Sequence, residues 1–268
     1  MRKISIIENG IPVSSKIAEQ VSTKLIDAGF EVLTSSVDGA ELVICIGGDG
    51  SFLSTLAKFD FPEIPFAGIN TGHLGFFQEL DEVDIDFFIE NYLAGKFTRQ
   101  KYRSVVGTIH SEGSTVLVRG LNEIVVKSNN FKLAHLDIYI GDNHIEKFSG
   151  DGVVVSTPAG STAYNYALGG SIVDPRLDLL QLTPIAATST SAYRSFTSGI
   201  LLPPDLSVEI IVKNVYDEDI AVAVDGRDVG IKCVEKISVG LSENEVELLR
   251  FKDYQFWNTV KEKLLTQE

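Results

Sequence analysis

An aspartate set among glycines is the first feature of this sequence that points to chemistry. Gly47-Gly48-Asp49-Gly50 directly follows Leu42 to Ile46, an unbroken apolar run. Such a run is typical of a central parallel strand buried on both faces, and the apolar spacing from Ser51 to Ala57 predicts a helix. In open α/β sheets, ligands bind beyond the carboxyl ends of the strands, where glycines let an anion approach the backbone. The turn is therefore a candidate phosphate site.

Asp49 is the unusual residue of this turn, because a carboxylate would repel a bound phosphate. It could instead accept a proton, hold a metal or bind a sugar hydroxyl. The alternative is that Asp49 is only a turn residue, since aspartate tolerates left-handed backbone. For the turn taken alone, the two explanations are equally good.

A second candidate site is the run from Ser149 to Asn165. Its glycine-flanked Asp151 precedes an apolar strand, and a hydroxyl-rich turn then leads into a predicted helix, capped by Ser161 or Thr162 and ended by Gly169-Gly170. Hydroxyls and free amides at a strand end suit a ribose or a phosphate. A capped helix without a ligand is the commoner explanation of such a run by itself.

Two shorter pairs suit the same kind of site. Asn122-Glu123 begins a predicted strand and offers an amide and a carboxylate, which suit hydroxyl groups or an adenine edge. Asp225-Gly226 ends the predicted strand Ile220 to Val224, much as Asp49 follows its own strand. Either pair alone is more often a turn or a strand end.

Composition limits the classes of partner. The 268 residues are 44% hydrophobic, enough for two cores, and the formal charge of -14 argues against nucleic acid as a partner. No apolar run is long enough to cross a membrane, and the N-terminal run is too short for a signal peptide, so we expect a cytoplasmic protein without a membrane partner. Cys45 and Cys233 are isolated and are expected to be packed thiols. An acidic protein that binds phosphorylated molecules needs backbone amides, local cations or a divalent metal to offset repulsion.

The order of the elements predicts an α/β fold made of two different domains. Strands alternate with helices up to about residue 100, which indicates a doubly wound, Rossmann-like parallel sheet. Short β-rich runs follow from Tyr102 and indicate a mostly antiparallel domain. The final helix, Tyr254 to Leu265, carries Trp257 and is expected to pack back on the N-terminal domain. The predicted boundaries are 1–100, 101–250 and 251–268.

The predicted elements of the first domain are the strands Lys3–Ile7, Phe30–Leu33, Leu42–Ile46 and Pro65–Ile69 and the helices Ser14–Ala28 and Val83–Leu93. The predicted strands of the second domain are Ser104–His110, Thr115–Val118, Glu123–Val126, Ala134–Ile140, His144–Phe148, Gly152–Ser156, Ser207–Val212, Ile220–Val224, Lys236–Val239 and Val246–Leu249. There is no Walker loop, no GxGxxG after the first strand, and no histidine spacing that suits a metal, so no metal ligand is predicted. Only His73 lies near the suspected chemistry.

Together, these motifs resemble those of the NAD kinase family, bacterial type. The resemblance rests on GGDG, on the Asn70–Phe76 turn NTGHLGF one strand later, on Asn122-Glu123 and on GDGVVVSTPAGSTAYN, and it follows nearly the whole chain in order. GGDG alone is weak, because lipid kinases and phosphofructokinase-like enzymes have similar turns, whereas the last run is specific. The resemblance implies phosphoryl transfer to the 2′-hydroxyl of the adenosine ribose of NAD, giving NADP, from ATP or polyphosphate and with Mg²⁺.

The resemblance also implies roles for individual residues. Asp49 matches the family's proton acceptor, and Asn122 and Glu123 match a pair that meets the adenine ribose. Asp151 matches an acidic residue near the nicotinamide end of NAD. The other positions that match the NAD pocket are Gly50, Ala159, Thr162, Ala163, Tyr164, Ala167, Ala186 and Asp225.

The resemblance further implies a homodimer or homotetramer, in which Ala186 reaches the site across the subunit interface. Two positions depart from the family pattern. Ser149 stands where many members have a basic residue, which leaves the cation for the NAD diphosphate unassigned. Ala159 stands where relatives often have a hydroxyl.

Two other functions are compatible with parts of the sequence. A lipid or sugar kinase that shares only the GGDG turn would phosphorylate its own acceptor and leave NAD untouched. A non-catalytic regulator would bind NAD without making a product, but Asp49 would then have no task.

Overall fold

The computed structural model describes residues 1–72, 75–130, 132–189, 194–213 and 220–265. The chain forms two compact units: unit 1 comprises Met1–Tyr102 and Glu245–Glu268, and unit 2 comprises Arg103–Asn244. Two long strands, β5 (Thr98–Ser111) and β16 (Val234–Arg250), carry the chain from one unit to the other.

Unit 1 is built on a parallel sheet, as predicted. Its strand order is β2-β1-β3-β4-β16, and every neighbouring pair that the structure describes is parallel. Each residue of β3 is buried, which explains the unbroken apolar run in the sequence. Its strands other than β16 are β1 (Lys3–Glu8), β2 (Glu31–Leu33), β3 (Leu42–Ile46) and β4 (Phe66–Ile69).

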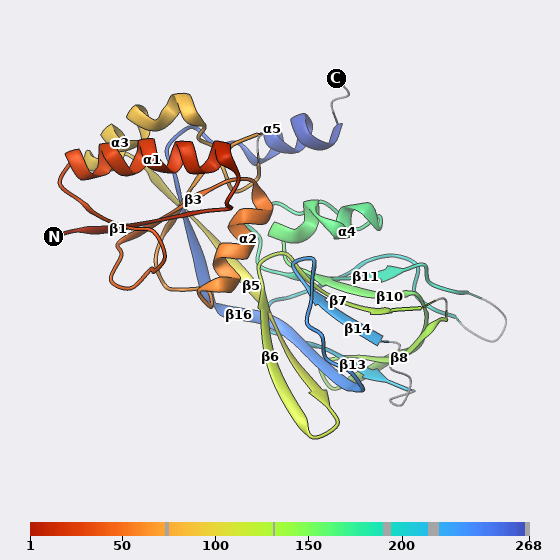
Figure 1. The fold of residues 1–268 in the computed structure, drawn as a ribbon. Helices are drawn as coiled ribbons and strands as arrows, with labels where there is room; N and C mark the ends of the chain where they lie inside the picture. Colours follow the sequence, from red (N-terminus) through yellow and green to blue (C-terminus); the bar gives the residue numbers. More distant parts are fainter. Residues whose placement is uncertain (73–74, 131, 190–193, 214–219, 266–268) are drawn as a thin grey trace. The chain divides into compact units, whose positions relative to one another are not determined.

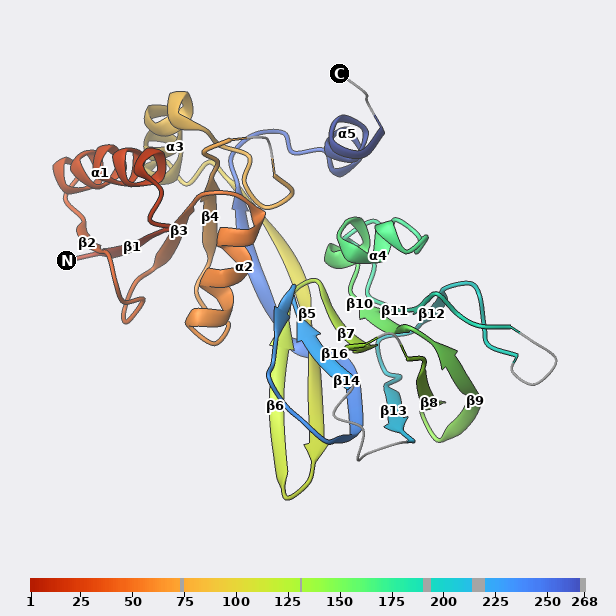
Figure 2. The same cartoon turned by 45° about the vertical axis from the view of Figure 1, so that its right-hand side comes forward.

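Helices cover both faces of this sheet (Figures 1 and 2). On one face, Val21 of α1 and Phe88 of α3 share an apolar cluster with Ile44 of β3. On the other face, Phe52 of α2 packs edge-on against Phe66 of β4, with ring centroids 5.6 Å apart. The helical elements are α1 (Pro12–Asp27), α2 (Asp49–Lys58), the 3-10 turn η1 (Glu82–Asp84), α3 (Ile85–Leu93), α5 (Phe256–Val260) and the π-helical turn η3 (Lys261–Leu265).

Unit 2 consists of two antiparallel sheets around one apolar core. One sheet contains β9, β8, β13 and β16 in that order, with β5 and β6 attached to β16, and the other has the order β12-β11-β10-β7-β14-β15. Its elements besides β5 and β16 are β6 (Ser114–Gly120), β7 (Glu123–Ser128), β8 (Ala134–Ile140), β9 (Asn143–Gly150), β10 (Gly152–Ser156), the 3-10 turn η2 (Ala159–Thr162), α4 (Tyr164–Ala167), β11 (Leu180–Ile185), β12 (Ile200–Leu202), β13 (Val208–Val212), β14 (Ile220–Val224) and β15 (Arg227–Asp228).

Four local predictions were wrong. The helix after the GGDG turn begins at Asp49 rather than at Ser51. The strands predicted at Lys236–Val239 and Val246–Leu249 are parts of the single strand β16. The helix predicted from a cap at Ser161 or Thr162 to Gly169-Gly170 is only the 3-10 turn η2 followed by the four-residue α4, whose N-cap has no side-chain hydrogen bond. Strands β11, β12 and β15 were not predicted at all.

The final helical segment packs against the rest of unit 1, as predicted. The ring of Phe256 lies 6.0 Å from that of Phe76, and the side chains of Thr259 and Val260 are buried. No helix among the described residues is long and apolar enough to span a membrane. Both cysteines are free thiols, with Cys45 buried in β3 and Cys233 half-buried.

Candidate active site

The GGDG turn places Asp49 in the first turn of α2, directly beyond the carboxyl end of β3. Gly48 is the N-cap residue, and Asp49 has helical backbone, so the alternative of a left-handed turn residue is wrong. Gly47 has a φ of +144°, and a Cβ there would lie 2.3 Å from Ser51 Oγ. Glycine is therefore required at position 47 for both conformation and space.

Among the described residues of unit 1, three donors hold the carboxylate of Asp49. Oδ2 accepts the backbone N–H of Phe76 at 3.1 Å and the ammonium of Lys263 at 3.1 Å, and Oδ1 accepts the N–H of Phe77 at 3.0 Å. Gly75 makes room for it, since a Cβ there would lie 2.4 Å from Oδ1. Asp49 thus has a fixed position and stays partly exposed to solvent.

The donors Phe76 and Phe77 come from the turn after β4, so this turn and the GGDG turn form one structure. Asn70 stabilises its beginning, because its side chain both donates to the carbonyl of Gly72 at 2.8 Å and accepts the Gly72 N–H at 3.2 Å. His73 and Leu74 of the NTGHLGF motif lie outside the described residues. That His73 lies near the chemistry therefore stays a prediction.

A polar groove of about 490 Å³ runs along α2 from the GGDG turn. This volume is within the range of small-molecule sites. A Cβ added at Gly50 would meet no atom within 4 Å, so a ligand can lie against the backbone there. The groove is lined by Ile7, Glu8, Asn9, Gly50, Ser51, Ser54, Thr55 and Lys58.

In unit 2, Asn122 and Glu123 are buried and keep oxygens without a partner. Their side chains are 8% and 4% exposed, and neither Asn122 Oδ1 nor Glu123 Oε2 has a hydrogen-bond donor. Burial, and then the nearby charge of Asp225, raise the pKa of Glu123 to about 8. Buried polar atoms are nearly always satisfied, so these two oxygens favour a ligand that donates hydrogen bonds.

Asp225 fixes the backbone of this pair. Its carboxylate accepts the N–H groups of Leu121, Asn122 and Glu123, at 2.8, 2.8 and 3.3 Å. Burial raises the pKa of Asp225, and the three N–H donors lower it in part. The residue has a φ of +47°, a conformation that aspartate tolerates better than most residues. Asp225 therefore acts on Asn122 and Glu123 through the main chain.

The STPAG segment contacts the same pair. Thr157 Oγ1 donates to the carbonyl of Leu121 at 2.6 Å and accepts the N–H of Gly160 at 3.1 Å. A Cβ on Gly160 would lie 2.1 Å from the carbonyl oxygen of Asn122, so only glycine fits there. The structure thus brings together two motifs that are more than thirty residues apart in the sequence.

One side chain of the TAYN segment is buried and holds the segment in place, so it is not available to a ligand. Asn165 is fully buried, and its Oδ1 accepts the hydroxyl of Thr183 at 2.6 Å, so it holds α4 on the sheet. Tyr164 and Ala167 are exposed, whereas Thr162 and Ala163 are half-buried. Four of the predicted pocket positions therefore have accessible side chains.

Asp151 and Ala186 are also neighbours in unit 2. The N–H of Asp151 donates to the carbonyl of Ile185 at 2.9 Å, and both Asp151 and Ala186 are exposed. Ala186 has a φ of +45°. Ser149, which stands where a basic residue was expected, is buried and bonds His135 Nδ1 through its hydroxyl at 2.9 Å, so it supplies no cation. Ala159 is half-buried.

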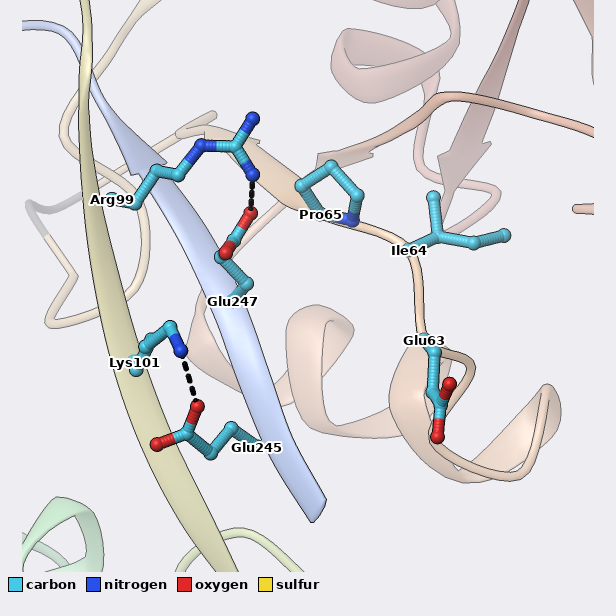
Figure 3. Close-up of a pocket in the computed structure, with 7 residues that line it drawn as sticks. All are labelled: Glu63, Ile64, Pro65, Arg99, Lys101, Glu245 and Glu247. Atoms are coloured by element: carbon cyan, nitrogen blue, oxygen red, sulfur yellow. Dashed lines mark hydrogen bonds and ion pairs between the residues drawn. The ribbon is translucent and has the colours of Figure 1, made fainter.

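A second hollow, of about 280 Å³, belongs to unit 1 and contains no predicted site residue (Figure 3). Its cations are paired across β5 and β16: Arg99 bonds Glu247, and Lys101 lies 2.6 Å from Glu245. The other lining residues are Glu63, Ile64 and Pro65. Because both of its cations are already paired with carboxylates, this hollow is better explained as a cross-strand ladder of ion pairs than as a site for an anionic ligand.

Comparison with known proteins decides the family. The N-terminal domain model of ATP-NAD kinases matches residues 9–97, and the C-terminal domain model matches residues 121–251. The chain belongs to the ATP-NAD kinase family. The predicted family and enzyme class are thereby confirmed. A lipid or sugar kinase that shares only the GGDG turn is excluded, because the match also covers the second half of the chain.

Individual relatives agree with this result. The chain is 38% identical to the NAD kinase of Finegoldia magna over 98% of its own length and 97% of the relative. It is 33% identical to NAD kinase 1 of Listeria monocytogenes, serovar 1/2a, over 89% and 91% of the two chains. Both relatives are named as kinases, so the alternative of a non-catalytic regulator is not supported.

Solved structures confirm the predicted fold. The structure of yeast NADH kinase complexed with NADH superposes with a TM-score of 0.85 at 21% identity and covers 99% of this chain and 87% of that one. The structure of an NAD kinase from Archaeoglobus fulgidus in complex with ATP gives 0.77 at 23% identity, covering 97% and 98%.

Sequence reasoning missed Lys263, Phe76 and Phe77 as partners of Asp49. The two amides have no sequence signal, because any residue except proline supplies one. Lys263 lies 214 residues from Asp49 in a segment predicted only to pack on the core. The roles of the predicted site residues stay predictions.

Proposed function

We propose that this NAD kinase transfers the terminal phosphoryl group of ATP to the 2′-hydroxyl of the adenosine ribose of NAD. The 2′-oxygen attacks the terminal phosphorus, the bond from that phosphorus to the bridging oxygen breaks, and ADP leaves with the electron pair. Asp49 accepts the proton of the hydroxyl. The products are NADP and ADP.

The observation that carries this proposal is the fixed and partly exposed carboxylate of Asp49. A hydroxyl is a poor nucleophile, so a positioned base within hydrogen-bond reach aids its attack. The amides of Phe76 and Phe77 hold the carboxylate at two oxygens, which leaves lone pairs available for a substrate hydroxyl.

On the acceptor side, we assign the unpartnered oxygens of Asn122 and Glu123 to the adenosine of NAD. Ribose hydroxyls and the adenine amino group are donors, and both oxygens are acceptors. Asp225 and Thr157 support the pair through hydrogen bonds to its main chain. The other positions that match the family's NAD pocket remain proposed pocket positions: Gly50, Asp151, Ala159, Thr162, Ala163, Tyr164, Ala167, Ala186 and Asp225.

On the donor side, the groove along α2 is the proposed site for ATP. Its hydroxyls and the cation of Lys58 suit a nucleotide, and the open space beside Gly50 lets the triphosphate pass the first turn of the helix toward Asp49. Polyphosphate would enter by the same route. Whether the enzyme uses it is decided by substituting it for ATP in the assay.

Mg²⁺ is proposed as a companion of ATP rather than a resident of the protein. Among the described residues there is no group of three or more His, Cys, Asp or Glu that could hold a metal ion. Mg²⁺ is commonly bound through substrate phosphates with only one or two carboxylates. No step of the proposed reaction relies on a metal held by the protein.

The test is production of NADP from NAD and ATP, read by an NADP-specific dehydrogenase. The wild-type protein should be active, and Asp49→Asn should lower kcat by about 10²- to 10⁴-fold while the KM for NAD changes less than about twofold. Asp27→Asn, on the exposed end of α1, is the matched control and should resemble the wild type. Activity of Asp49→Asn within about threefold of wild type would remove the proposed role of Asp49.

Two further properties stay proposals. A homodimer or homotetramer is expected from the family, with Ala186 near the subunit interface, and light scattering should then give a multiple of 29.2 kDa. The cytoplasmic location is tested by cell fractionation.

A further inference from the structure

Among the contacts that the described residues make with the Asp49 carboxylate, the ion pair with Lys263 is the one that the proposed function does not use. The ammonium of Lys263 lies 3.1 Å from Asp49 Oδ2 and 4.9 Å from the centroid of the Phe76 ring. Lys263 belongs to η3, a π-helical turn, and such turns are frequent at functional sites. The preceding helix is anchored by buried Thr259 and Val260, so the position of Lys263 is supported by packing.

Stability alone is a weak explanation for this pair. The side chains of Lys263 and Asp49 are 28% and 26% exposed. Ion pairs in contact with solvent contribute little to the free energy of unfolding. Another ion pair, between Lys252 and Asp84 at 2.6 Å, already attaches the same C-terminal segment to the rest of unit 1.

The chemistry of the reaction gives the pair a better explanation. Phosphoryl transfer depends mainly on positioning and on stabilising the charge of the transferred group. The terminal phosphate must come next to the hydroxyl whose proton Asp49 accepts, so a cation in contact with Asp49 is also within reach of the phosphate oxygens. A lysine suits this task because its four-carbon stem lets the ammonium exchange one anionic partner for another. The chain's charge of -14 makes such a local cation more necessary.

We infer that Lys263 binds the terminal phosphate of ATP, and that its ammonium exchanges the Asp49 carboxylate for that phosphate when ATP enters. This inference rests on the proposed function. Lys263 forms no covalent bond. The exchange has two effects: it stabilises the charge on the transferred phosphoryl group, and it frees Oδ2 of Asp49 for the substrate hydroxyl.

Kinetics of Lys263→Met, Lys263→Arg and the matched control Lys252→Met give the first test. Lys252→Met removes the cation of an ion pair of the same kind from the same segment, away from Asp49. Lys263→Met should lower kcat about 100-fold, as does the loss of one charge-stabilising donor in other enzymes, with the KM for NAD within about twofold of wild type. Lys263→Arg should recover part of the loss, and Lys252→Met should stay within about twofold of wild type.

Binding to ADP and to a non-hydrolysable ATP analogue separates this role from a structural one. In the inferred role, Lys263 contacts only the terminal phosphate. Calorimetry should therefore show that Lys263→Met weakens binding of the ATP analogue about tenfold more than it weakens binding of ADP. If Lys263 only supported the fold, its substitution would weaken the binding of both ligands equally. That outcome, or equal kinetic losses in Lys263→Met and Lys252→Met, would overturn the inference. The proposed function fails separately, if wild-type protein makes no NADP from NAD and ATP.

Discussion

At the scale of single residues, Glu123 combines deep burial with an unpaired oxygen. Burial raises its pKa to about 8 from an ordinary value of 4.5, so the folded protein keeps a proton there that the unfolded chain releases. Folding therefore takes up a proton between these two pH values. Wherever the folded state binds the extra proton, the free energy of unfolding falls as pH rises.

Glu123→Gln tests this linkage, because glutamine imitates the protonated acid at every pH. The free energy of unfolding of the wild type should fall between about pH 5 and pH 8, and the fall should be shallower in Glu123→Gln. Urea unfolding at a series of pH values measures both slopes. Glu235→Gln, at an exposed position of β16, is the control and should keep the wild-type slope. Equal slopes in the wild type and Glu123→Gln would contradict the burial argument.

Asp225 differs from Glu123, because both oxygens of its carboxylate accept hydrogen bonds from backbone N–H groups. Asp225→Ala should lower the free energy of unfolding by about 3 kcal/mol, because it leaves the N–H groups of Leu121, Asn122 and Glu123 without their acceptor. Asp225→Asn keeps one acceptor oxygen and tolerates the left-handed backbone, so its loss should be smaller. Chemical denaturation compares the two, and an equal loss would mean that the carboxylate hydrogen bonds are not the cause.

At the scale of elements, α2 carries the base at its first residue and the proposed ATP groove along one face. Ser54 is exposed in that groove, so Ser54→Trp should fill it without disturbing the core. We expect the KM for ATP to rise more than about tenfold while the KM for NAD stays within about twofold. Thr23→Trp, on the exposed side of α1, is the matched control. A parallel rise in both KM values would place ATP elsewhere.

The sequence predicted most elements because their burial is regular. The wholly buried β3 and the alternating burial of β13 match the expected apolar patterns. Strand β11 escaped prediction because Pro184 lies within it, and proline usually argues against a strand inside a sheet. In β16, the polar residues Ser242 to Asn244 resemble a turn, but the strand continues through them. A sequence pattern cannot detect such strands, because pairing with neighbouring strands determines whether they form.

The site could be predicted only in part for a similar reason. Asp49, Asn122, Glu123 and Asp225 were singled out because their side chains suit a ribose or phosphate site and because their motifs together resemble those of the NAD kinase family. Their partners could not be found, because Asp225 meets Leu121 across 104 residues and Asp49 meets Lys263 across 214. Contacts over such distances follow from the fold as a whole.

At the scale of the whole molecule, the charge of -14 repels both anionic substrates. Charges act over about 30 Å at 0.01 M salt and about 10 Å at 0.1 M, so moderate salt should relieve this repulsion. We expect kcat/KM for ATP to rise a few-fold over that range while kcat stays constant. Steady-state kinetics at several concentrations of potassium chloride measure this. A steady fall in kcat/KM would instead mean that local cations such as Lys58 dominate the approach of ATP.

The return of β16 to the first unit has a consequence for synthesis on the ribosome. Unit 2 is one continuous segment, whereas unit 1 needs residues from both ends of the chain. The middle of the chain can complete its core while the N-terminal sheet still waits for its last strand. Because Leu248 pairs with Phe66 and Lys263 meets Asp49, a nascent chain stalled before these residues has a finished second unit and an unfinished first one.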